Sequence, residues 1–265
     1  KLYISQPAVS QHIKALEVAV GTRLFERSRR GISLTLAGRT LLEHTRDILR
    51  RVAIAENAVT NVANLSDGKT NIGATPNISS YLLPEWIRGF REKYPKLTPS
   101  VQTDVTSRTI GDVLAGQLNL GLVEGEIDED VPDKLRYIVL QDVPQHIVVG
   151  RLHDWWERES VSIHELAEQP FVMRQQTSQT RIWLNDVLQA HGIVPRVTGE
   201  FDNPEAIKHA TMTGYCVTIL PEYAIQKEAD LELLHIVRVA DIDLRRELKL
   251  VWDGDRVFPP VTRAF

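Results

Sequence analysis

Near its start the chain reads Ile4-Ser5-Gln6-Pro7-Ala8-Val9-Ser10-Gln11-His12-Ile13-Lys14-Ala15-Leu16-Glu17, and this stretch predicts an amphipathic helix. Ser5 is a suitable N-cap, because its hydroxyl can accept a hydrogen bond from an early helical N–H. Pro7 fits the first turn, where its missing N–H costs nothing. Apolar residues recur at helical spacing and predict one buried face, formed by Val9, Ile13, Leu16 and Val20.

Another face of this helix is polar and suits the major groove of DNA. It carries Gln6, Ser10, Gln11 and Lys14. Gln can pair with the edge of adenine, Ser with several groups, and Lys with guanine or phosphate. A polar face is also typical of an ordinary solvated helix, so this feature alone leaves both interpretations open.

A basic turn follows the helix. Gly21 is expected to end the helix, because glycine tolerates left-handed geometry, and Leu24 and Phe25 add apolar side chains. The turn carries Arg27, Arg29, Arg30 and Gly31, and Ile32-Ser33-Leu34 then alternates as a strand does. A basic hairpin beside a helix can place guanidinium groups on phosphates or in the minor groove. A solvated turn is the alternative.

Four segments together resemble the signature of the LysR-type transcriptional regulators: Ile4 to Ser10, Ile13 to Glu17, Gly21 to Arg27 and Leu34 to Gly38. The resemblance implies a winged helix-turn-helix over residues 1–35. We expect its DNA contacts to come from Ser5, Gln6, Pro7, Ser10, Gln11, Lys14, Arg27, Arg29 and Arg30. The family has a first helix, and most of a second, before the position of Lys1, so the sequence is expected to be part of a longer protein. Leu36 stands where the family commonly has proline.

Residues 36–66 predict a long helix without proline. A seam at a and d positions of a heptad pattern is formed by Leu41, Thr45, Ile48, Val52, Ala55, Val59 and Val62. A helix packed on its own domain would also explain this seam. In the resembled family the helix is the dimerisation linker, which implies a homodimer, usually assembled into a homotetramer, and palindromic half-sites in the DNA.

Composition and charge bound the class of protein. The chain has 265 residues, 43% of them apolar and 25% charged, as in a globular protein, and it lacks an apolar run long enough for a membrane helix. One cysteine, Cys216, excludes an internal disulfide and a cysteine-based zinc cluster, and we expect a cytoplasmic protein. The net charge of −4 divides unevenly: residues 1–69 carry 11 Lys+Arg against 6 Asp+Glu, and the remainder carries 20 against 29. Such asymmetry indicates a basic head on an acidic body.

After Lys69 short apolar runs alternate with helical stretches, which predicts an α/β body. Predicted strands are 70–74, 100–105, 118–123, 135–140, 146–150, 170–173, 196–201, 216–220, 234–239 and 247–252. Predicted helices are 81–94, 110–115, 181–191, 205–213 and 221–227, with another near Pro260. The strand and helix order in 70–123 recurs in 171–220, which favours two similar lobes. With the resemblance, this implies a two-lobed effector domain of the type II periplasmic-binding-protein class, with lobe I at 70–143 and 247–265 and lobe II at 144–246.

Polar turns follow the first predicted strand of each lobe. Free N–H groups at helix starts there suit anions, although the residues alone favour ordinary helix capping, which needs no ligand. The resemblance implies effector binding between the lobes, and the candidate residues are Thr75, Asn77, Ile78, Ser79, Gly125, Arg174, Gln175, Thr177, Phe201 and Asn203. Arg174 and the helix starts favour a small, anionic metabolite. Glu124 and Glu126 are interpreted as a solvated turn.

No catalytic constellation is recognisable: the sequence contains no HExxH, GxSxG, Walker or GxGxxG pattern. We therefore expect a bacterial DNA-binding transcriptional regulator controlled by a small-molecule effector, without enzymatic activity, metal or cofactor. Double-stranded promoter DNA and a second copy of the chain are the expected partners, RNA polymerase is a candidate partner, and no membrane is expected. The alternative is a stand-alone solute-binding protein of the same two-lobed fold.

Overall fold

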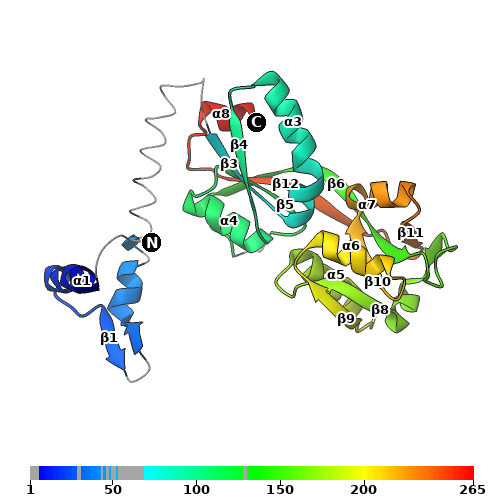
Figure 1. Ribbon diagram of the computed structural model, residues 1–265, viewed down its shortest axis with the longest axis horizontal. Helices are drawn as coiled ribbons and strands as arrows, with labels where there is room; N and C mark the ends of the chain where they lie inside the picture. Colours follow the sequence, from blue (N-terminus) through cyan, green and yellow to red (C-terminus); the bar gives the residue numbers. More distant parts are fainter. Residues whose placement is uncertain are drawn as a thin grey trace. The chain divides into compact units, whose positions relative to one another are not determined.

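The computed structural model describes residues 6–28, 31–42, 44–45, 48, 52, 69–127 and 130–265. The chain forms two compact units, Lys1–Val59 and Thr60–Phe265 (Figure 1). In the first unit, helix α1 (Gln6–Val20) precedes an antiparallel hairpin of β1 (Phe25–Ser28) and β2 (Gly31–Leu34). Gly21 ends α1 with a φ of 70°.

Side-chain hydrogen bonds fix the helix and the hairpin to one another. Oε1 of Glu17 accepts from the backbone N–H groups of Leu24, at 2.7 Å, and Phe25, at 3.2 Å. Thr35 begins the next helical segment, residues 36–42, by accepting from the N–H of Gly38 at 3.0 Å. Capping of this kind is typical of Thr at a helix start.

The predicted buried face of α1 is wrong within this unit. Val9, Leu16 and Val20 are 39%, 42% and 42% exposed, and Ile13 is only half-buried. A two-stranded hairpin and the short helical segment 36–42 offer α1 little surface against which to bury an apolar stripe. Leu24 is the only fully buried large apolar side chain among the described residues up to 52.

The predicted seam of the linker helix is only partly described. Leu41 and Thr45 are half-buried, whereas Ile48 and Val52 are 61% and 49% exposed. The remaining seam residues, Ala55, Val59 and Val62, lie outside the described residues. The seam as a dimer contact therefore stays a prediction.

The second unit contains two sheet regions, which we call lobe I and lobe II. Lobe I has strand order β4-β3-β5-β12-β6. Its elements are β3 (Lys69–Ala74), η1 (Ile78–Leu82), α3 (Leu83–Lys93), β4 (Thr98–Thr103), α4 (Thr106–Ala115), β5 (Leu120–Glu124), the first part of β6 (Leu135–Gly150), β12 (Arg245–Asp253) and α8 (Pro260–Ala264). Strands β3, β4 and β5 are parallel, as βαβ units require.

Lobe II repeats this plan. Its elements are the second part of β6, β7 (Ser160–Val161), η2 (Ile163–Glu168), β8 (Pro170–Arg174), α5 (Gln179–Ala190), β9 (Arg196–Phe201), α6 (Pro204–Met212), β10 (Val217–Pro221), α7 (Glu222–Asp230) and β11 (Leu234–Val239). Strands β8, β9 and β10 are parallel to one another. The segments β7 and η2 were not predicted from the sequence.

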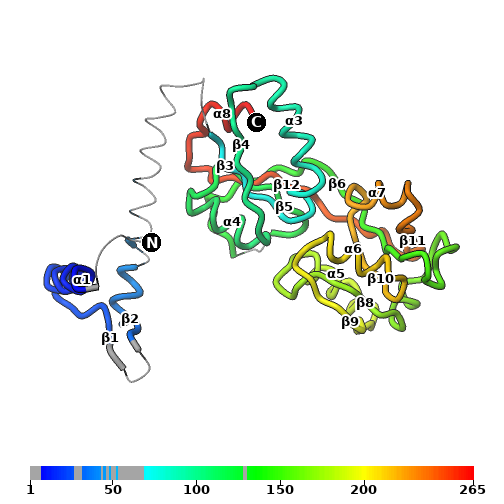
Figure 2. The backbone as a smooth tube through the Cα atoms, viewed as in Figure 1, coloured from blue at the N-terminus to red at the C-terminus, as the bar shows by residue number. Residues whose placement is uncertain are grey.

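Strand β6 belongs to both lobes. The sequence predicts two strands here, 135–140 and 146–150, but the structure has one strand of 16 residues. It pairs with β12 as far as Pro144 and with β10 from Gln145 onward, and the tube in Figure 2 can be followed through this passage. Lobe I thus takes residues 69–144 and 245–265, and lobe II residues 145–244. Proline is tolerated because β6 lies at the edge of the lobe I sheet, where one side of the strand needs no partner.

Each lobe has its own apolar core on both faces of its sheet. In lobe II, Ile147 and Val149 pack with the α5 side, while Val148 packs with Leu220 and Ile225 on the α7 side. This alternation follows from the two-residue period of a strand. Within the described residues, no helix is both long enough and apolar enough to cross a bilayer.

Candidate functional site

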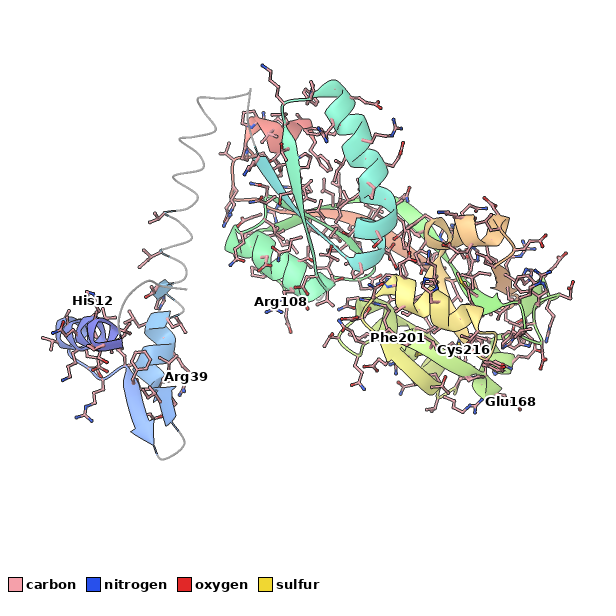
Figure 3. All side chains as sticks on the ribbon, in the orientation of Figure 1. His12, Arg39, Arg108, Glu168, Phe201 and Cys216 are labelled. Atoms are coloured by element: carbon pink, nitrogen blue, oxygen red, sulfur yellow. The ribbon has the colours of Figure 1, made fainter. Side chains whose placement is uncertain are left out.

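Helix α1 presents polar side chains to solvent. Ser10, Gln11 and Lys14 are exposed, and so is Pro7; Figure 3 labels His12 on the same helix. The predicted contacts Ser5, Arg29 and Arg30 lie outside the described residues, as do the side chains of Gln6 and Arg27. Within the first unit, the described residues of the predicted DNA-contacting face are therefore exposed to solvent.

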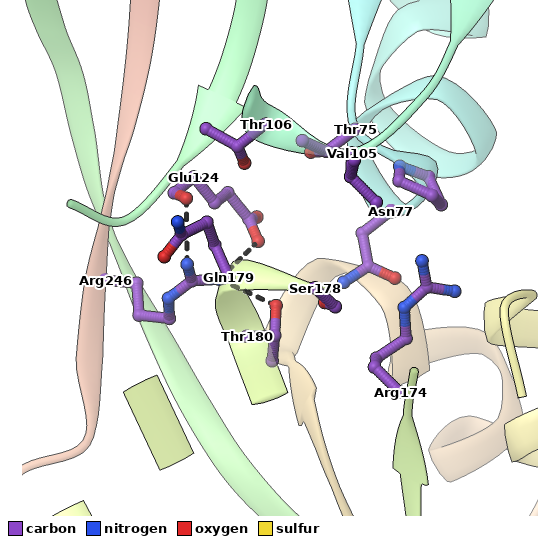
Figure 4. Close-up of a pocket in the computed structure, with 11 residues that line it drawn as sticks. Thr75, Asn77, Val105, Thr106, Glu124, Arg174, Ser178, Gln179, Thr180 and Arg246 are labelled. Atoms are coloured by element: carbon purple, nitrogen blue, oxygen red, sulfur yellow. Dashed lines mark hydrogen bonds and ion pairs between the residues drawn. The ribbon is translucent and has the colours of Figure 1, made fainter. Parts of the chain in front are cut away.

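A small cavity, partly open to solvent, lies between the two lobes. Lobe I lines it with Thr75, Pro76, Asn77, Val105, Thr106, Glu124 and Arg246, and lobe II with Arg174, Ser178, Gln179 and Thr180 (Figure 4). Most of these residues follow the carboxyl ends of parallel strands. Ligands of open α/β sheets bind at such strand ends.

Two helices begin at the cavity without a side-chain cap. Helix α4 starts after Val105 and helix α5 after Ser178, and neither residue makes a side-chain capping hydrogen bond. The first N–H groups of a helix have no partner within the helix, and the helix dipole adds partial positive charge there. One such start on each lobe favours an anionic group between them.

Glu124 and Arg246 form a buried charged pair in the lining of the cavity. Nη2 of Arg246 donates to the backbone carbonyl of Glu124 at 2.8 Å, and Nη1 lies 3.5 Å from the carboxylate Oε2. Nη1 also donates to Oγ1 of Thr180, at 2.8 Å, which ties β12 to helix α5 of lobe II (Figure 4). The two charged side chains are 3% and 2% exposed, so the predicted solvated turn is wrong for Glu124 and fits only Glu126, which is 86% exposed.

Burial sets the protonation of this pair. Removal from water raises the pKa of Glu124, against the opposing influence of Arg246 and of the hydrogen bond that the Tyr223 hydroxyl donates to it. Burial likewise lowers the pKa of Arg246. Burial and the neighbouring Glu124 raise the pKa of Tyr223, so this phenol stays protonated and continues to donate.

Several polar atoms at the cavity lack partners. Within the part of the chain that the structure describes, Oγ1 of Thr75, Oδ1 of Asn77 and Nε of Arg246 are buried and make no hydrogen bond. All three residues line the cavity. Because buried polar atoms in folded proteins nearly always have a partner, their gathering here indicates a site built to receive a polar ligand.

Of the ten residues expected at an effector site, Thr75, Asn77 and Arg174 line the cavity. Arg174 is 8% exposed and donates from Nη1 to the carbonyl of Asp202. Burial lowers the pKa of Arg174, opposed by the charge of Asp202. These three placements agree with the expected location between lobes, while their contact with an effector stays a prediction.

Seven expected residues do not line the cavity. They are Ile78, Ser79, Gly125, Gln175, Thr177, Phe201 and Asn203. Ile78 is buried in the lobe I core, and the hydroxyl of Ser79 pairs with that of Thr103 at 2.6 Å. Asn203 caps α6 by accepting from the N–H of Glu205.

The other four expected residues also have different positions. The backbone N–H of Gln175 donates to the carbonyl of Phe201. Thr177 is exposed, and Phe201, labelled in Figure 3, is 38% exposed at the end of β9. Gly125 has a φ of 86°, and a Cβ built on it would lie 2.0 Å from Nη2 of Arg246. Its contribution is to leave room for that guanidinium.

The charged pair itself was not predicted from the sequence. Arg246 stands in a polar segment, Asp241 to Glu247, that reads as an exposed connection. The available signal was the alternation of β12, which places Arg246, Leu248 and Leu250 on one face of the strand. Burial of Arg246 follows from the approach of α5 and the turn at Gly125, which the local sequence does not encode.

A second set of polar contacts joins the lobes beside the cavity. The hydroxyl of Tyr81 in η1 donates to Oε1 of Glu205 in α6, at 2.6 Å. Nζ of Lys208 lies 4.5 Å from the centre of the Tyr81 ring and pairs with Glu228 at 2.7 Å. Hydrogen bonds from Tyr81 and Lys208 lower the pKa of Glu205, although burial opposes this. These contacts stabilise the lobe arrangement that the structure shows.

The described residues contain no group of three or more His, Cys, Asp or Glu side chains arranged to hold a metal ion. The chemistry available in the cavity is that of two guanidinium groups, a buried carboxyl, hydroxyls, two side-chain amides and backbone N–H groups. Such a set can bind and orient a small polar molecule.

Comparison with known protein families gives two matches that together span nearly the whole chain. Residues 63–265 match the family model described as the LysR substrate binding domain. Residues 1–39 match the model described as the bacterial regulatory helix-turn-helix protein of the lysR family.

The chain is also similar to individual proteins of known sequence or structure. A probable RuBisCO transcriptional regulator of Guillardia theta is 31% identical over 267 residues, covering 100% of this chain and 86% of the relative. Full-length CbnR complexed with its target DNA has a TM-score of 0.71 at 19% identity, covering 99% of this chain and 88% of that one. The regulatory domain of CcmR from Synechocystis PCC6803, in complex with 2-PG, has a TM-score of 0.69 at 21% identity, covering 75% of this chain and 94% of that one.

Proposed function

Because the chain belongs to the LysR family of bacterial transcriptional regulators, we propose that its binding to promoter DNA is controlled by a small anionic metabolite held between lobes I and II. The first unit supplies the DNA-binding head and the second the sensor. The alternative of a stand-alone solute-binding protein is disfavoured by the helix-turn-helix match over residues 1–39.

The observation that carries the sensor proposal is the set of unpartnered buried atoms in the cavity. Oγ1 of Thr75, Oδ1 of Asn77 and Nε of Arg246 need partners, and two uncapped helix starts add positive potential. The effector therefore carries an acidic group together with a hydrogen-bond donor for the Asn77 carbonyl oxygen. The fold shared with a regulatory domain in complex with 2-PG supports a small-molecule effector.

Head contacts are proposed for the exposed polar face of α1. Ser10, Gln11 and Lys14 lie within two turns on one side of the helix and are exposed, which suits entry into the major groove. The fold shared with CbnR in complex with its target DNA supports this role. Arg27, Arg29 and Arg30 are proposed as phosphate contacts of the hairpin.

The proposal also covers how chains assemble and how effector binding reaches the DNA-binding heads. We propose residues 1–35 as the DNA-binding domain and 36–66 as a linker helix that pairs two chains, with homotetramer formation and contact with RNA polymerase as further steps. Ligand binding favours one arrangement of the lobes, and the linker helices convert this into a changed spacing of the heads. The cavity residues act in binding, and we propose no catalysis.

The sensor proposal is tested by gel shifts on a promoter fragment with a panel of small hydroxy acids, dicarboxylates and phosphorylated acids. We expect at least one to change the DNA affinity, and Arg174→Ala to raise the concentration required by roughly tenfold or more, the loss of one charge-assisted hydrogen bond. Arg108→Ala, an exposed change on lobe I away from the cavity lining, is the matched control. An effector response that is unchanged in Arg174→Ala would refute the assigned cavity.

The head proposal is tested by two variants on the same helix. Gln11→Ala is expected to weaken discrimination between operator and mutated operator, whereas Lys14→Ala should weaken all sites about equally and reduce the salt slope by about 1. Equal effects of both variants on every site would show that the assigned face does not read bases.

A further inference from the structure

Glu124 and Arg246 form a buried ion pair in the lining of the cavity, and we infer that an anionic effector replaces the Glu124 carboxylate as the counter-ion of Arg246 while Glu124 takes up a proton from solvent. This inference rests on the proposed effector site and adds a regulatory property to it. Anion binding is then coupled to proton uptake, so the sensor responds to effector and pH together.

Geometry leaves Arg246 with one unused hydrogen-bond donor for an incoming anion. Its Nη atoms are engaged by the Glu124 carbonyl and by Thr180, but its Nε is buried without a partner. The carboxylate of Glu124 lies 3.5 Å from Nη1, a loose contact compared with charged hydrogen bonds of 2.7–2.9 Å. An anion that bonds Nε can therefore compete with Glu124 for the guanidinium.

The surrounding charges leave Glu124 without a second counter-ion. Tyr223 of α7 and Glu126 after β5 act electrostatically on this pair. The other ionisable groups on the elements that line or border the cavity are Glu247 and Lys249 of β12, Tyr81 of η1, Arg174 of β8, Arg181 of α5, and Asp104 and Arg108 near the start of α4. Lys249 donates to the carbonyl of Gly125 at 2.8 Å and pairs with Glu247 at 2.9 Å.

The remaining cations are also engaged. Arg174 donates to the carbonyl of Asp202, Arg181 to Asn185, and Arg108 lies 3.8 Å from Asp104. Tyr223 can only donate to Glu124 as a neutral phenol.

The energetics then favour protonation of Glu124. With an anion bonded to Arg246, the Glu124 carboxylate would keep a buried charge that has lost its ion-pair partner, and an unpaired buried charge is among the costliest features in a protein. One proton on Glu124 removes this unpaired charge. Burial already raises the pKa of Glu124, so this protonation needs less free energy than that of an exposed glutamate. The hydrogen bond from Tyr223 to the carboxyl oxygen can persist with the acid form.

The test uses sulfate, which keeps its charge across the range, in calorimetric titrations of the whole protein between about pH 5 and pH 8, a range that lies above the ordinary pKa of glutamate. Uptake of one proton predicts that sulfate affinity rises up to about tenfold for each unit by which the pH falls. The heat of binding should also differ between buffers of different ionisation enthalpy by the amount expected for one proton, a measurement that needs no variant.

Glu124→Gln is the matched control, because it keeps the shape but cannot titrate. It is expected to bind sulfate with little dependence on pH and with no proton uptake attributable to this site. Equal pH dependence and equal proton uptake in both proteins would overturn the inference, and so would an absence of sulfate binding to both. The proposed function falls only if the promoter gel shift also fails to respond to every anion of the panel.

Discussion

Gly125→Ala tests whether the turn after β5 is shaped by the guanidinium of Arg246. Gly125 has a φ of 86°, a conformation that L-residues adopt only with strain, and its Cβ would lie 2.0 Å from Nη2 and 2.7 Å from Cζ of Arg246. The side chain of Arg246 is 2% exposed, so the guanidinium has little room into which to move. The substitution should therefore destabilise the fold through both backbone and side chain.

The size of the effect follows from these two contributions. A left-handed conformation costs roughly 1–2 kcal/mol for a residue with a Cβ. Displacing Nη2 breaks its hydrogen bond to the Glu124 carbonyl, and a hydrogen bond from a charged group contributes about 1.5–3 kcal/mol. We expect the free energy of unfolding to fall by about 3–5 kcal/mol, measured by urea denaturation followed by circular dichroism.

Two comparisons make this prediction refutable. Gly89→Ala in α3 meets nothing within 4 Å and should stabilise by about 0.5–1 kcal/mol, as Ala does in a helix. In an Arg246→Met background the steric conflict is absent, so Gly125→Ala should cost only the backbone contribution of roughly 1–2 kcal/mol. Stability of Gly125→Ala equal to that of the parent, or the same loss in both backgrounds, would refute the reasoning.

Three further predictions concern other buried or paired groups. Lys208→Met should lower the free energy of unfolding by about 2–3 kcal/mol, because Lys208 is 2% exposed and its removal takes from the half-buried Glu228 its partner at 2.7 Å. Thermal unfolding that is unchanged would contradict this. Cys216 is 5% exposed and its pKa is raised by burial, so iodoacetamide should label it much more slowly in the folded than in the urea-unfolded protein, and equal rates would be inconsistent with the fold. Hydrogen bonding from Arg158 lowers the pKa of Glu165. The ionised Glu165 therefore stabilises the fold above the ordinary glutamate pKa, and this stabilisation is lost as the pH falls through the lowered pKa of the folded protein. The difference in the free energy of unfolding between the parent and Glu165→Gln should shrink from pH 7 to about pH 3, and a difference that grew would refute the assignment.

Much of the fold was predictable because strands and helices keep their own periods. The predicted strands 196–201 and 234–239 coincide with β9 and β11, and the winged helix-turn-helix plus two-lobed α/β class is confirmed by the family matches. The family resemblance and the regulatory function are confirmed by the same matches. Strand β6 was predicted in two pieces, because Pro144 reads as a break and only the edge position in the sheet makes it harmless.

The site was predictable only in outline. The polar turns after β3 and β8 are visible in the sequence, and Thr75, Asn77 and Arg174 line the cavity as expected of such turns. Glu124 and Arg246 were missed, because their burial depends on residues far away in the chain. A buried ion pair has no local sequence signature, and charged residues are otherwise mostly exposed.

Lobe II is inserted between two neighbouring strands of lobe I. Its ends, after Pro144 and before Arg245, leave from positions that are direct cross-strand partners. A short glycine–serine hairpin in place of residues 145–244 would span the gap, since paired residues of antiparallel strands lie only about 5 Å apart. The two lobes can accordingly be expressed as separate proteins. Lobe I would be the chain with the hairpin in place of residues 145–244, and lobe II would be the fragment 145–244, whose two ends lie close together.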